Sequence, residues 1–504
     1  MVVATDTLPD DVEKLKALIL SKDKALNDLR QQLNTLIEAL HIERQRHYAS
    51  RSEKGSSAQQ ELFDEAEECV AAEVDSEQGA PAVKSTKGKR SARKPLPAEL
   101  PRIRQIHELP EEQRQCACGC TLSEIGEDTS EQLDIIPAQV QVIVQVRKKY
   151  ACKHCEDTVK SAPRPAVLLP KAIASANTMA YVITAKYADG LPLYRLSEIL
   201  KRYKIDLPRQ TLSESVIKTG VAVEPLIERM REHLLSSTLL YMDETPVQVL
   251  NEPDRSPQSR SYIWVQKGGP PGETVVQFTY DPSRSTAVPS RLLTGFAGAL
   301  MTDGYKPYRT VATTQGLTHL CCWAHARRKF MDAKKAQPKG RSGKADMAIN
   351  LIAKLYAVES QHRLSDAAVR QRNREQISVP ALEKLRTWLD KTTIQTPPKS
   401  AIGKAVHYTL EYWSELTRYV GNADWPIDNN AAENAIRPFV VGRKAWLFSH
   451  SQRGANASAN LYSLIETAKA NQVEPYQYLS WLFDRLPVTP AEDIDQLLPW
   501  NMPN

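Results

Sequence analysis

The 504-residue sequence has no long apolar run of the kind that a membrane-spanning helix requires. No segment approaches the ~18 consecutive apolar residues from which such a helix is predicted. The N-terminal stretch MVVATDTLPDDVEKL also lacks a basic start followed by an apolar segment, so it does not resemble a secretory signal. The sequence therefore predicts neither a membrane protein nor a secreted protein, and it favours a cytoplasmic one.

The sequence has little excess of either charge, since its net charge is only +6. Charges of one sign are nevertheless concentrated in two segments. Residues 61–77 hold eight acids and neither Lys nor Arg, whereas residues 84–104 hold eight bases against one acid. Like charges in one block repel each other and usually prevent folding. We therefore interpret residues 49–106 as a charged disordered linker, in which the basic block can add non-specific attraction to phosphates.

Apolar residues near the N-terminus alternate in steps of four and three, with one polar interruption at Lys22. They are Leu8, Val12, Leu15, Ile19, Leu26, Leu29, Leu33, Leu36 and Leu40. A seam of this kind over several heptads is typical of a coiled coil. The alternative is a long amphipathic helix that packs on its own domain. Because a charged linker follows, we favour a leucine-zipper-like helix over residues 1–48 that forms a homodimer or a higher homo-oligomer.

Cysteine is infrequent, and the placement of the eight thiols matters more than their number. The segments QCACGC and YACKHC lie 30 residues apart or more, which is typical of two halves of a tetrahedral Zn²⁺ site. The predicted zinc ligands are Cys116, Cys118, Cys152 and Cys155, with Cys120 as an alternative ligand. The alternating valines between Val140 and Val146 predict a strand within this module, which we assign to residues 107–162. Cys69, Cys321 and Cys322 are assigned to no metal.

The rest of the chain changes from helical to mixed patterning. Short helices over Met179–Tyr187, Tyr194–Tyr203 and a third segment predict a helical domain at 163–235, either helix-turn-helix-like or an ordinary bundle. Short β-rich runs interspersed with helices predict a mixed α/β core. We assign that core to residues 236–330 and 425–470, with a helical insertion at 331–424 and a C-terminal tail at 471–504.

Three acids stand out within the predicted core. Asp243 and Asp303 each follow an apolar strand pattern, and Glu433 lies at the start of a predicted helix. Three carboxylates within ~4 Å would repel by about 4 kcal/mol per pair at an effective dielectric of about 20, so they require protons or a cation. Oxygen ligands of this kind suit Mg²⁺ or Mn²⁺. The structural alternative is that the aspartates end strands, and that Glu433 completes a capping box with Asn430 and pairs with Arg437.

Several blocks around these acids resemble one family. The segments YMDETPVQV, MTDGYKPY, CCWAHARRKF and IDNNAAENAIRPFVVGRKAWLFSHSQRGA are similar to the core of the IS66 group of bacterial insertion-sequence transposases, the TnpC-type DDE enzymes. The cysteine-containing segment, GLPLYRLSEILKR and the leucine heptads also resemble that family in order along the chain. The segment RQRHYASRSEK is only a loose match.

The resemblance implies an RNase H-like fold whose catalytic triad is Asp243, Asp303 and Glu433, with bound Mg²⁺ or Mn²⁺. It also implies binding of the element's terminal inverted repeats and target DNA, and accessory proteins from the same element. Six basic residues near the acids are candidate DNA-backbone contacts, with a solvated basic surface as the alternative. They are His325, Arg328, Lys329, Arg437, Arg443 and Lys444.

The sequence therefore predicts a cytoplasmic, nucleoid-associated DNA transposase that hydrolyses and transfers phosphodiester bonds with a DDE triad. Zn²⁺ is expected in the cysteine module, and no membrane partner is expected. Two alternatives stay open: a DNA-binding regulator without enzymatic activity, and a nuclease that cuts without strand transfer.

Overall fold

The computed structural model describes residues 11–48, 140–151, 159–161, 163, 165–170, 172–336 and 343–503. These residues belong to two units, Met1–Glu77 with Arg164–Asn504, and Gln78–Pro163. Among the described helices, none has both the length and the apolar character needed to cross a bilayer.

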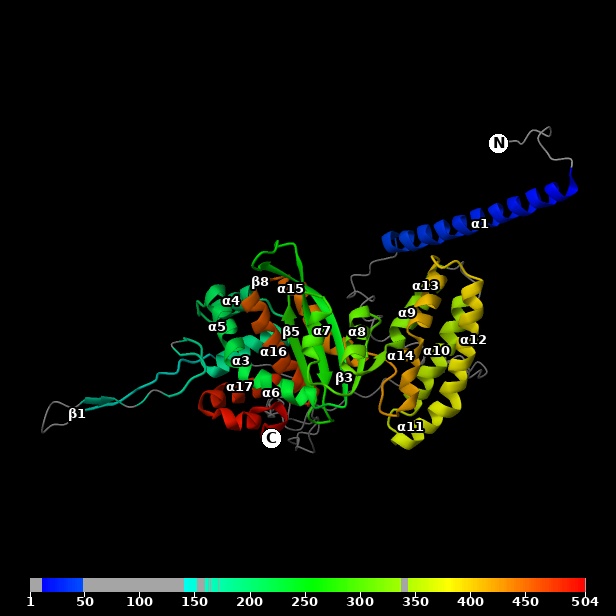
Figure 1. The fold of residues 1–504 in the computed structure, drawn as a ribbon. Helices are drawn as coiled ribbons and strands as arrows, with labels where there is room; N and C mark the ends of the chain where they lie inside the picture. Colours follow the sequence, from blue (N-terminus) through cyan, green and yellow to red (C-terminus); the bar gives the residue numbers. More distant parts are fainter. Residues whose placement is uncertain are drawn as a thin grey trace, which may run out of the picture. The chain divides into compact units, whose positions relative to one another are not determined.

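The N-terminal heptad segment forms one continuous helix, α1 (Val12–Tyr48), drawn in blue in Figure 1. Several of its seam residues are more than half exposed, including Leu26, Leu29 and Leu33. Large apolar side chains on one isolated helix are rarely left in water, because about 0.8 kcal/mol is gained for each buried CH₂ group. The predicted helix is confirmed, and its pairing with a second copy stays a prediction.

In the second unit the structure describes a small antiparallel hairpin, formed by β1 (Lys149–Ala151) and β2 (Val159–Ser161). The strand expected at the alternating valines is wrong in position. Residues 140–148 are exposed and belong to no strand of the described chain. Alternation shows which side chains share a face, but a strand also needs a partner, and here the partner lies opposite Lys149–Ala151. The five predicted zinc cysteines lie outside the described residues.

A mixed sheet forms the centre of the remaining chain. Its strands are β3 (Leu239–Asn251), β4 (Arg260–Gly268), β5 (Val275–Asp281), β6 (Ala299–Thr302), β7 (Thr318–Cys321) and β8 (Ser449–Ser451). The order is β5-β4-β3-β6-β7, in which β3, β4 and β5 are antiparallel neighbours and β6 and β7 run parallel to β3. The short β8 pairs with the far end of β3. The expected mixed α/β architecture is therefore present.

Helices from both ends of this region share one hydrophobic core with the sheet. They are α3 (Ala176–Tyr187), α4 (Leu193–Arg202), α5 (Arg209–Ala222), α6 (Glu224–Leu235), α7 (Ala287–Leu292), α8 (Lys306–Gln315), α15 (Asn430–Trp446), α16 (Gln452–Ala470) and α17 (Pro475–Arg485). Helix α3 starts after Ser175, whose side-chain oxygen accepts the backbone N–H of Thr178. Because α3 packs on α17 and α5 on α16, the early helices rest directly on the sheet region.

The edge of the sheet at β5 is covered by α16 instead of another strand. The hydroxyl oxygens of Ser463 and Thr467 accept the backbone N–H groups of Phe278 and Val276, at 2.8 and 3.0 Å. An exposed strand edge would otherwise offer these N–H groups to a neighbouring molecule. The segment that contains Glu433 is thus joined at both ends to the sheet, by α15 and by α16.

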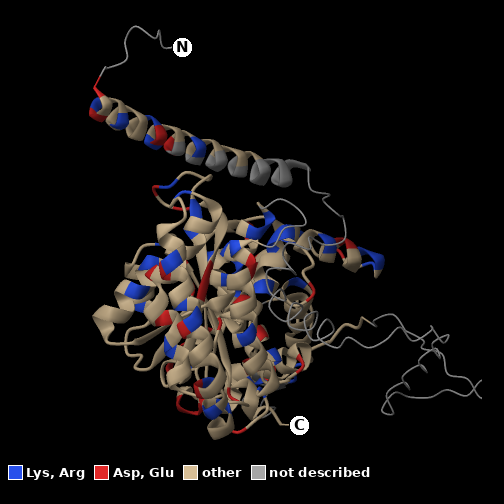
Figure 2. Cartoon of the chain, turned by 90° about the vertical axis from the view of Figure 1, so that its right-hand side faces the viewer, with Lys and Arg blue, Asp and Glu red and all other residues tan. Residues whose placement is uncertain are grey.

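A second hydrophobic core lies among the helices that connect β7 to α15. These helices are α9 (Trp323–Lys335), α10 (Lys344–Gln361), α11 (Ala367–Asn373), α12 (Val379–Ile394), α13 (Ala401–Glu411) and α14 (Trp413–Thr417), drawn mainly in yellow in Figure 1. A π-helical segment, Arg374–Ser378, joins α11 to α12. Figure 2 is turned so that this side faces the viewer, and its ribbon shows Lys and Arg interspersed with Asp and Glu along the helices. The polar sequence of this region therefore covers an apolar interior.

Candidate active site

Asp243 and Asp303 lie on neighbouring parallel strands of the sheet. The register pairs Tyr241 of β3 with Met301 of β6, so each aspartate stands two residues beyond an aligned pair. Asp303 follows the end of β6, as the sequence predicts. Asp243 does not end its strand, because β3 continues to Asn251 in antiparallel pairing with β4. The expected strand end was wrong, since the polar residues after Asp243 alternate with buried ones and continue the strand.

Glu433 reaches the sheet from the first turn of α15. The residue before the helix, Asn429, is fully buried, and its side-chain amide donates to the carbonyl oxygen of Met242 on β3, at 3.0 Å. Its backbone N–H donates to Sγ of Cys322, at 3.2 Å. These two bonds fix the start of α15 between β3 and the end of β7. Glu433 is thereby held beside Asp243, the neighbour of Met242.

The predicted capping box is not formed. Asn429, and not Asn430, is the residue that precedes the helix, and its side chain makes no capping hydrogen bond. The carboxylate of Asp428 instead accepts the backbone and side-chain N–H groups of Asn430, at 3.1 and 3.0 Å. The tertiary bond to β3 therefore replaces the local cap that the sequence pattern favours.

Two nitrogen contacts of Glu433 come from α9. Nδ1 of His325 lies 3.4 Å from Oε1 of Glu433, and a guanidinium nitrogen of Arg328 lies 3.8 Å from Oε2. The ammonium group of Lys329 lies 4.5 Å from the centre of the Tyr408 ring, and its charge lowers the pKa of Asp303. The three basic residues predicted on this helix are thus gathered around two of the acids. A role in binding phosphates stays a prediction.

The three carboxylates are close enough to perturb one another. Burial raises the pKa of Glu433 to about 7, with Asp303 among the charges that add to the rise and Arg328 opposing it. The pKa of Asp243 is raised well above its ordinary value by burial and by Glu244, Glu433 and Asp303. Burial also raises the pKa of Asp303. A bound cation would remove this penalty, because it stabilises the ionised form of every carboxylate.

Sequence reasoning missed a fourth acid and its partners. Glu244 is buried beside Asp243, and the guanidinium of Arg284 donates to it at 2.7 Å while the Tyr308 hydroxyl donates to its other oxygen. Arg284 also stacks 3.9 Å from the centre of the Tyr305 ring. Glu244 follows Asp243 directly in the segment YMDETPVQV, and this position next to a candidate acid could have identified it from the sequence. Arg284 lies in an unremarkable loop, and only the fold brings it here.

The loop that contains Asp303 is bound to the helical insertion. The Tyr412 hydroxyl donates to the carbonyl oxygen of Gly304 at 2.6 Å, and the Tyr408 ring covers the same glycine so closely that an added Cβ would lie 2.5 Å from it. The backbone N–H of Tyr305 donates to the Asp303 carboxylate at 2.9 Å. The position of this carboxylate therefore depends on side chains from α13 and its end.

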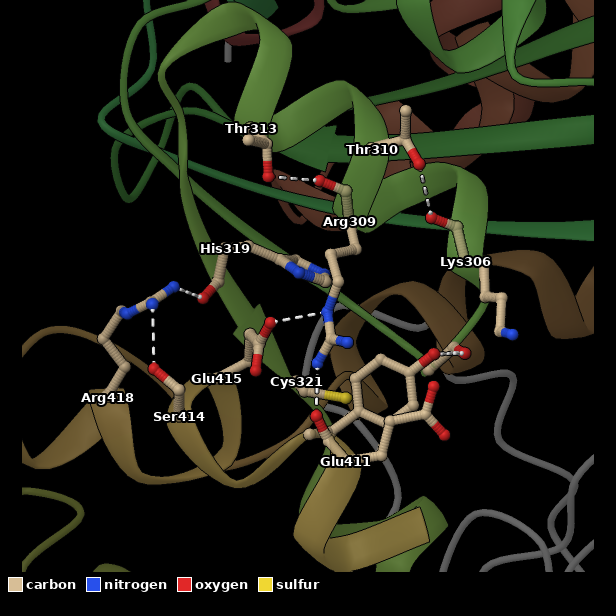
Figure 3. A network of polar contacts seen from close by, with 12 residues as sticks. Lys306, Arg309, Thr310, Thr313, His319, Cys321, Glu411, Ser414, Glu415 and Arg418 are labelled. Carbon is tan, nitrogen blue, oxygen red and sulfur yellow. Dashed lines mark hydrogen bonds and ion pairs between the residues drawn. The ribbon is translucent and has the colours of Figure 1, made fainter.

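Polar contacts extend this connection away from the acids (Figure 3). Arg309 of α8 donates to the Glu415 carboxylate at 2.7 Å and to the Glu411 carbonyl oxygen at 2.6 Å. Arg418 donates to the carbonyl oxygen of His319 at 2.5 Å. Nε2 of His319 lies 2.8 Å from the hydroxyl of Thr302, the residue before Asp303, and burial lowers the pKa of this histidine to about 4. A neutral His319 thus links the insertion to the strand end.

The other predicted basic residues lie along α15. Arg443 donates to the hydroxyl of Thr245 at 3.1 Å and to the carbonyl oxygen of Pro246, so its guanidinium also attaches α15 to β3. Arg437 is half-buried and Lys444 is exposed on the same helix. Their contact with DNA stays a prediction.

Four family models match successive parts of the chain. The model described as Transposase IS66 family matches residues 171–457, more than half of the chain. Residues 463–500 match the IS66 C-terminal element, and residues 113–156 match the zinc-finger binding domain of transposase IS66. Residues 35–104 match the model described as Transposase C of IS166 homeodomain.

Similar curated proteins come from Sinorhizobium fredii (strain NBRC 101917 / NGR234). The uncharacterized protein y4jD is 32% identical over 515 residues, which cover 98% of this chain and 97% of the relative. The uncharacterized protein y4qI is 31% identical over 540 residues, which cover 99% of both chains. No solved structure matches the chain.

Proposed function

We propose, from the premise that this chain belongs to the IS66 family of transposases, that it cuts and joins DNA with Asp243, Asp303 and Glu433. The observation that carries the proposal is the convergence of these acids from β3, the end of β6 and the first turn of α15. The mixed sheet with the first two acids on adjoining strands supports an RNase H-like core.

The chemistry of the three carboxylates suits a divalent cation with oxygen ligands. Burial raises the pKa of each one, and neither carboxylate oxygen of Glu433 has a hydrogen-bond partner in the described part of the chain. Clustered, desolvated oxygens of this kind suit Mg²⁺ or Mn²⁺. When bound, such ions activate a water or a 3′-hydroxyl for attack on phosphorus and stabilise the leaving oxygen.

The protein's own groups then position the acids and the DNA. Asn429 holds the start of α15 against β3, and Tyr412 holds the loop after β6. The carboxylates of Glu433 and Asp303 are thereby positioned before DNA binds. Arg328 supplies positive charge beside Glu433, and Arg437 and Lys444 add positive charge further along α15. These charges would hold the DNA backbone without reading its sequence. Neutral His325 cannot add charge, because burial together with Arg328 and Lys329 lowers its pKa to about 3.

Other parts of the chain would bring DNA ends to this site. The zinc-finger segment would bind Zn²⁺ through Cys116, Cys118, Cys152 and Cys155, with Cys120 as an alternative to one of the first two. Together with α3 to α6 it would recognise the terminal inverted repeats. Helix α1 would pair subunits so that two ends meet. Accessory proteins of the same element and association with the nucleoid belong to the same proposal.

The test uses DNA that carries the ends of the element in which the gene lies. The full chain should nick this DNA only with Mg²⁺ or Mn²⁺, and Asp303→Asn and Glu433→Gln should each abolish nicking while leaving DNA binding measurable. Lys306→Gln, a change at an exposed residue close to the same loop, serves as the matched control. A pre-cleaved end that is joined to target DNA distinguishes a transposase from a nuclease. If the wild type binds this DNA but does not nick it, the remaining interpretation is a DNA-binding regulator without enzymatic activity.

A further inference from the structure

A second set of ligand atoms also includes Glu433. Cys322 follows β7, His325 lies in the first turn of α9, and Glu433 lies in the first turn of α15. One ligand atom from each residue, a thiol sulfur, an imidazole nitrogen and a carboxylate oxygen, falls within 4.8 Å of the other two. Three different elements therefore bring three different metal-binding groups together.

The spacing is close to that of a tetrahedral metal ion. Metal–ligand distances of about 2.0–2.3 Å place neighbouring ligand atoms roughly 3.3–3.8 Å apart. Nδ1 of His325 and Oε1 of Glu433 already lie 3.4 Å apart. Sγ of Cys322 accepts the backbone N–H of Asn429 at 3.2 Å, a bond that a metal-bound thiolate can also accept. Since the remaining ligand atoms lie within 4.8 Å of one another, a movement of about 1 Å would complete the set.

The same atoms have no hydrogen-bond partner in the described residues. Both carboxylate oxygens of Glu433 and Nδ1 of His325 are buried without one. Glu433 is only 3% exposed, and Cys322 is fully buried. Buried polar atoms without partners are rare in native proteins and often mark the place of an ion or water. These groups thus point to a ligand that the protein itself does not supply.

We propose that Cys322, His325 and Glu433 bind a thiophilic divalent cation of the Zn²⁺ class. A thiolate and an imidazole prefer such ions over Mg²⁺, which takes oxygen ligands. Three protein ligands with one open position are also a common zinc arrangement. On binding, the thiol of Cys322 releases its proton to solvent and its sulfur forms the bond to the metal.

The charge of the site allows this ion beside Arg328. The ion contributes two positive charges, and the thiolate and carboxylate contribute two negative charges, so the filled site is neutral. Arg328, at 3.8 Å from Oε2 of Glu433, therefore experiences no net repulsion from it. The ion uses Glu433, which is also one of the three acids proposed for the hard cation.

This sharing has a regulatory consequence that rests on the proposed function. An ion held by Cys322 and His325 withdraws Glu433 from Asp243 and Asp303. The hard-cation site then lacks one ligand, and DNA cleavage stops. Zn²⁺ would thus inhibit the enzyme through its own catalytic acid, and removal of Zn²⁺ would restore activity.

The binding test measures metal content in the full chain. Wild type, Cys322→Ser, His325→Gln and Cys321→Ser are loaded with Zn²⁺, freed of excess and analysed for zinc per chain. Cys321 is the matched control, because it is also a buried thiol but its Sγ lies near the Tyr408 hydroxyl, at 3.9 Å. Zinc held by the zinc-finger segment is common to all four proteins and cancels.

We expect one zinc ion fewer per chain in Cys322→Ser and His325→Gln, and no loss in Cys321→Ser. Loading with Co²⁺ should show the same difference as a weaker thiolate-to-metal absorption band. Should Cys322→Ser disturb the buried packing, His325→Gln gives the result independently, because that side chain is 26% exposed. Equal zinc content in all four proteins would overturn the site.

The regulatory test titrates Zn²⁺ against Mg²⁺-dependent nicking, with each protein normalised to its own rate without zinc. Wild type and Cys321→Ser should be inhibited, and Cys322→Ser should need on the order of 100-fold more zinc. Equal inhibition of all three refutes the regulatory role even where the zinc count supports the site. Failure of every protein to nick DNA refutes the proposed function and leaves the metal count to decide the site.

Discussion

The replacement Glu433→Gln gives the sharpest physical test of the acid cluster. Glutamine keeps the size of the side chain and a carbonyl oxygen near His325 and Arg328, but it cannot ionise. In the folded protein, burial raises the pKa of Glu433 from 4.5 to about 7. A group whose folded pKa is raised stabilises the protein below its unfolded pKa, and this contribution is lost as the pH rises through the folded value. The wild type should therefore lose stability between about pH 5 and pH 8, and the variant should lose less.

The magnitude follows from the size of the shift. One pKa unit corresponds to about 1.4 kcal/mol, so the penalty from Glu433 is under about 1 kcal/mol at pH 5 and about 3 kcal/mol at pH 8. The stability difference between variant and wild type should thus grow by about 2 kcal/mol over this interval. His325 has a folded pKa of about 3, below its ordinary 6.5. His325 therefore lowers the free energy of unfolding as the pH falls. It does so in both proteins, so its contribution cancels in the stability difference between variant and wild type.

The assay is urea unfolding of both full-length proteins at pH 5 and pH 8, followed by tryptophan fluorescence, since Trp264 and Trp323 are fully buried. The buffers contain neither Mg²⁺ nor added Zn²⁺, so that no metal ion is supplied to Glu433, and no strong chelator, so that zinc in the zinc-finger segment is retained. Addition of Mg²⁺ at pH 8 should then stabilise the wild type more than the variant, because the ion favours the ionised carboxylate.

A pH-independent difference would refute the reasoning. It would mean that Glu433 is already ionised in the folded protein, as an ordinary ion-pair partner of Arg328 would be. Equal stabilisation of both proteins by Mg²⁺ would separately show that the ion binds elsewhere.

Three further changes test other parts of the structure. Gly304→Ala places a Cβ 2.5 Å from the Tyr408 ring; it should displace the loop of Asp303 and reduce the maximal nicking rate, while DNA binding measured by gel shift is retained. Asn429→Ala removes the bond to the Met242 carbonyl oxygen and should lower the free energy of unfolding at pH 5 by about 1–3 kcal/mol, measured by urea unfolding. Leu29→Lys puts a charge in the exposed seam of α1 and should reduce the mass of the particle in light scattering; an unchanged mass would argue against pairing through this helix.

Local signals in the sequence predicted much of the fold. Hydrophobic periodicity and the turn residues that end an element report local geometry. The helices around Met179 and Tyr194 and the strand end before Asp303 could therefore be predicted. The blocks that resemble the transposase family singled out all three acids. The structure adds their meeting point, which depends on parallel pairing of β3 with β6 and on a helix far along the chain.

Tertiary contacts explain where sequence reasoning failed. Asn430 and Glu433 have the spacing of a capping box, but the buried bond between Asn429 and Met242 decides how the helix starts. Arg284 reaches Glu244 across the fold from a loop that has no distinctive pattern. Among the described residues, no strand pairs with the alternating valines before β1. In each case a long-range partner determined the outcome, and a local pattern contains no information about that partner.

The bonds from Tyr412 to Gly304 and from Arg418 to His319 have a practical consequence for protein engineering. A shortened enzyme made by excising the helices between β7 and α15 would keep Asp243, Asp303 and Glu433, yet it would leave the carbonyl oxygens of Gly304 and His319 without their donors. A shortened form of this transposase should therefore keep the segment from α13 to Arg418, even where the other helices of the insertion are removed.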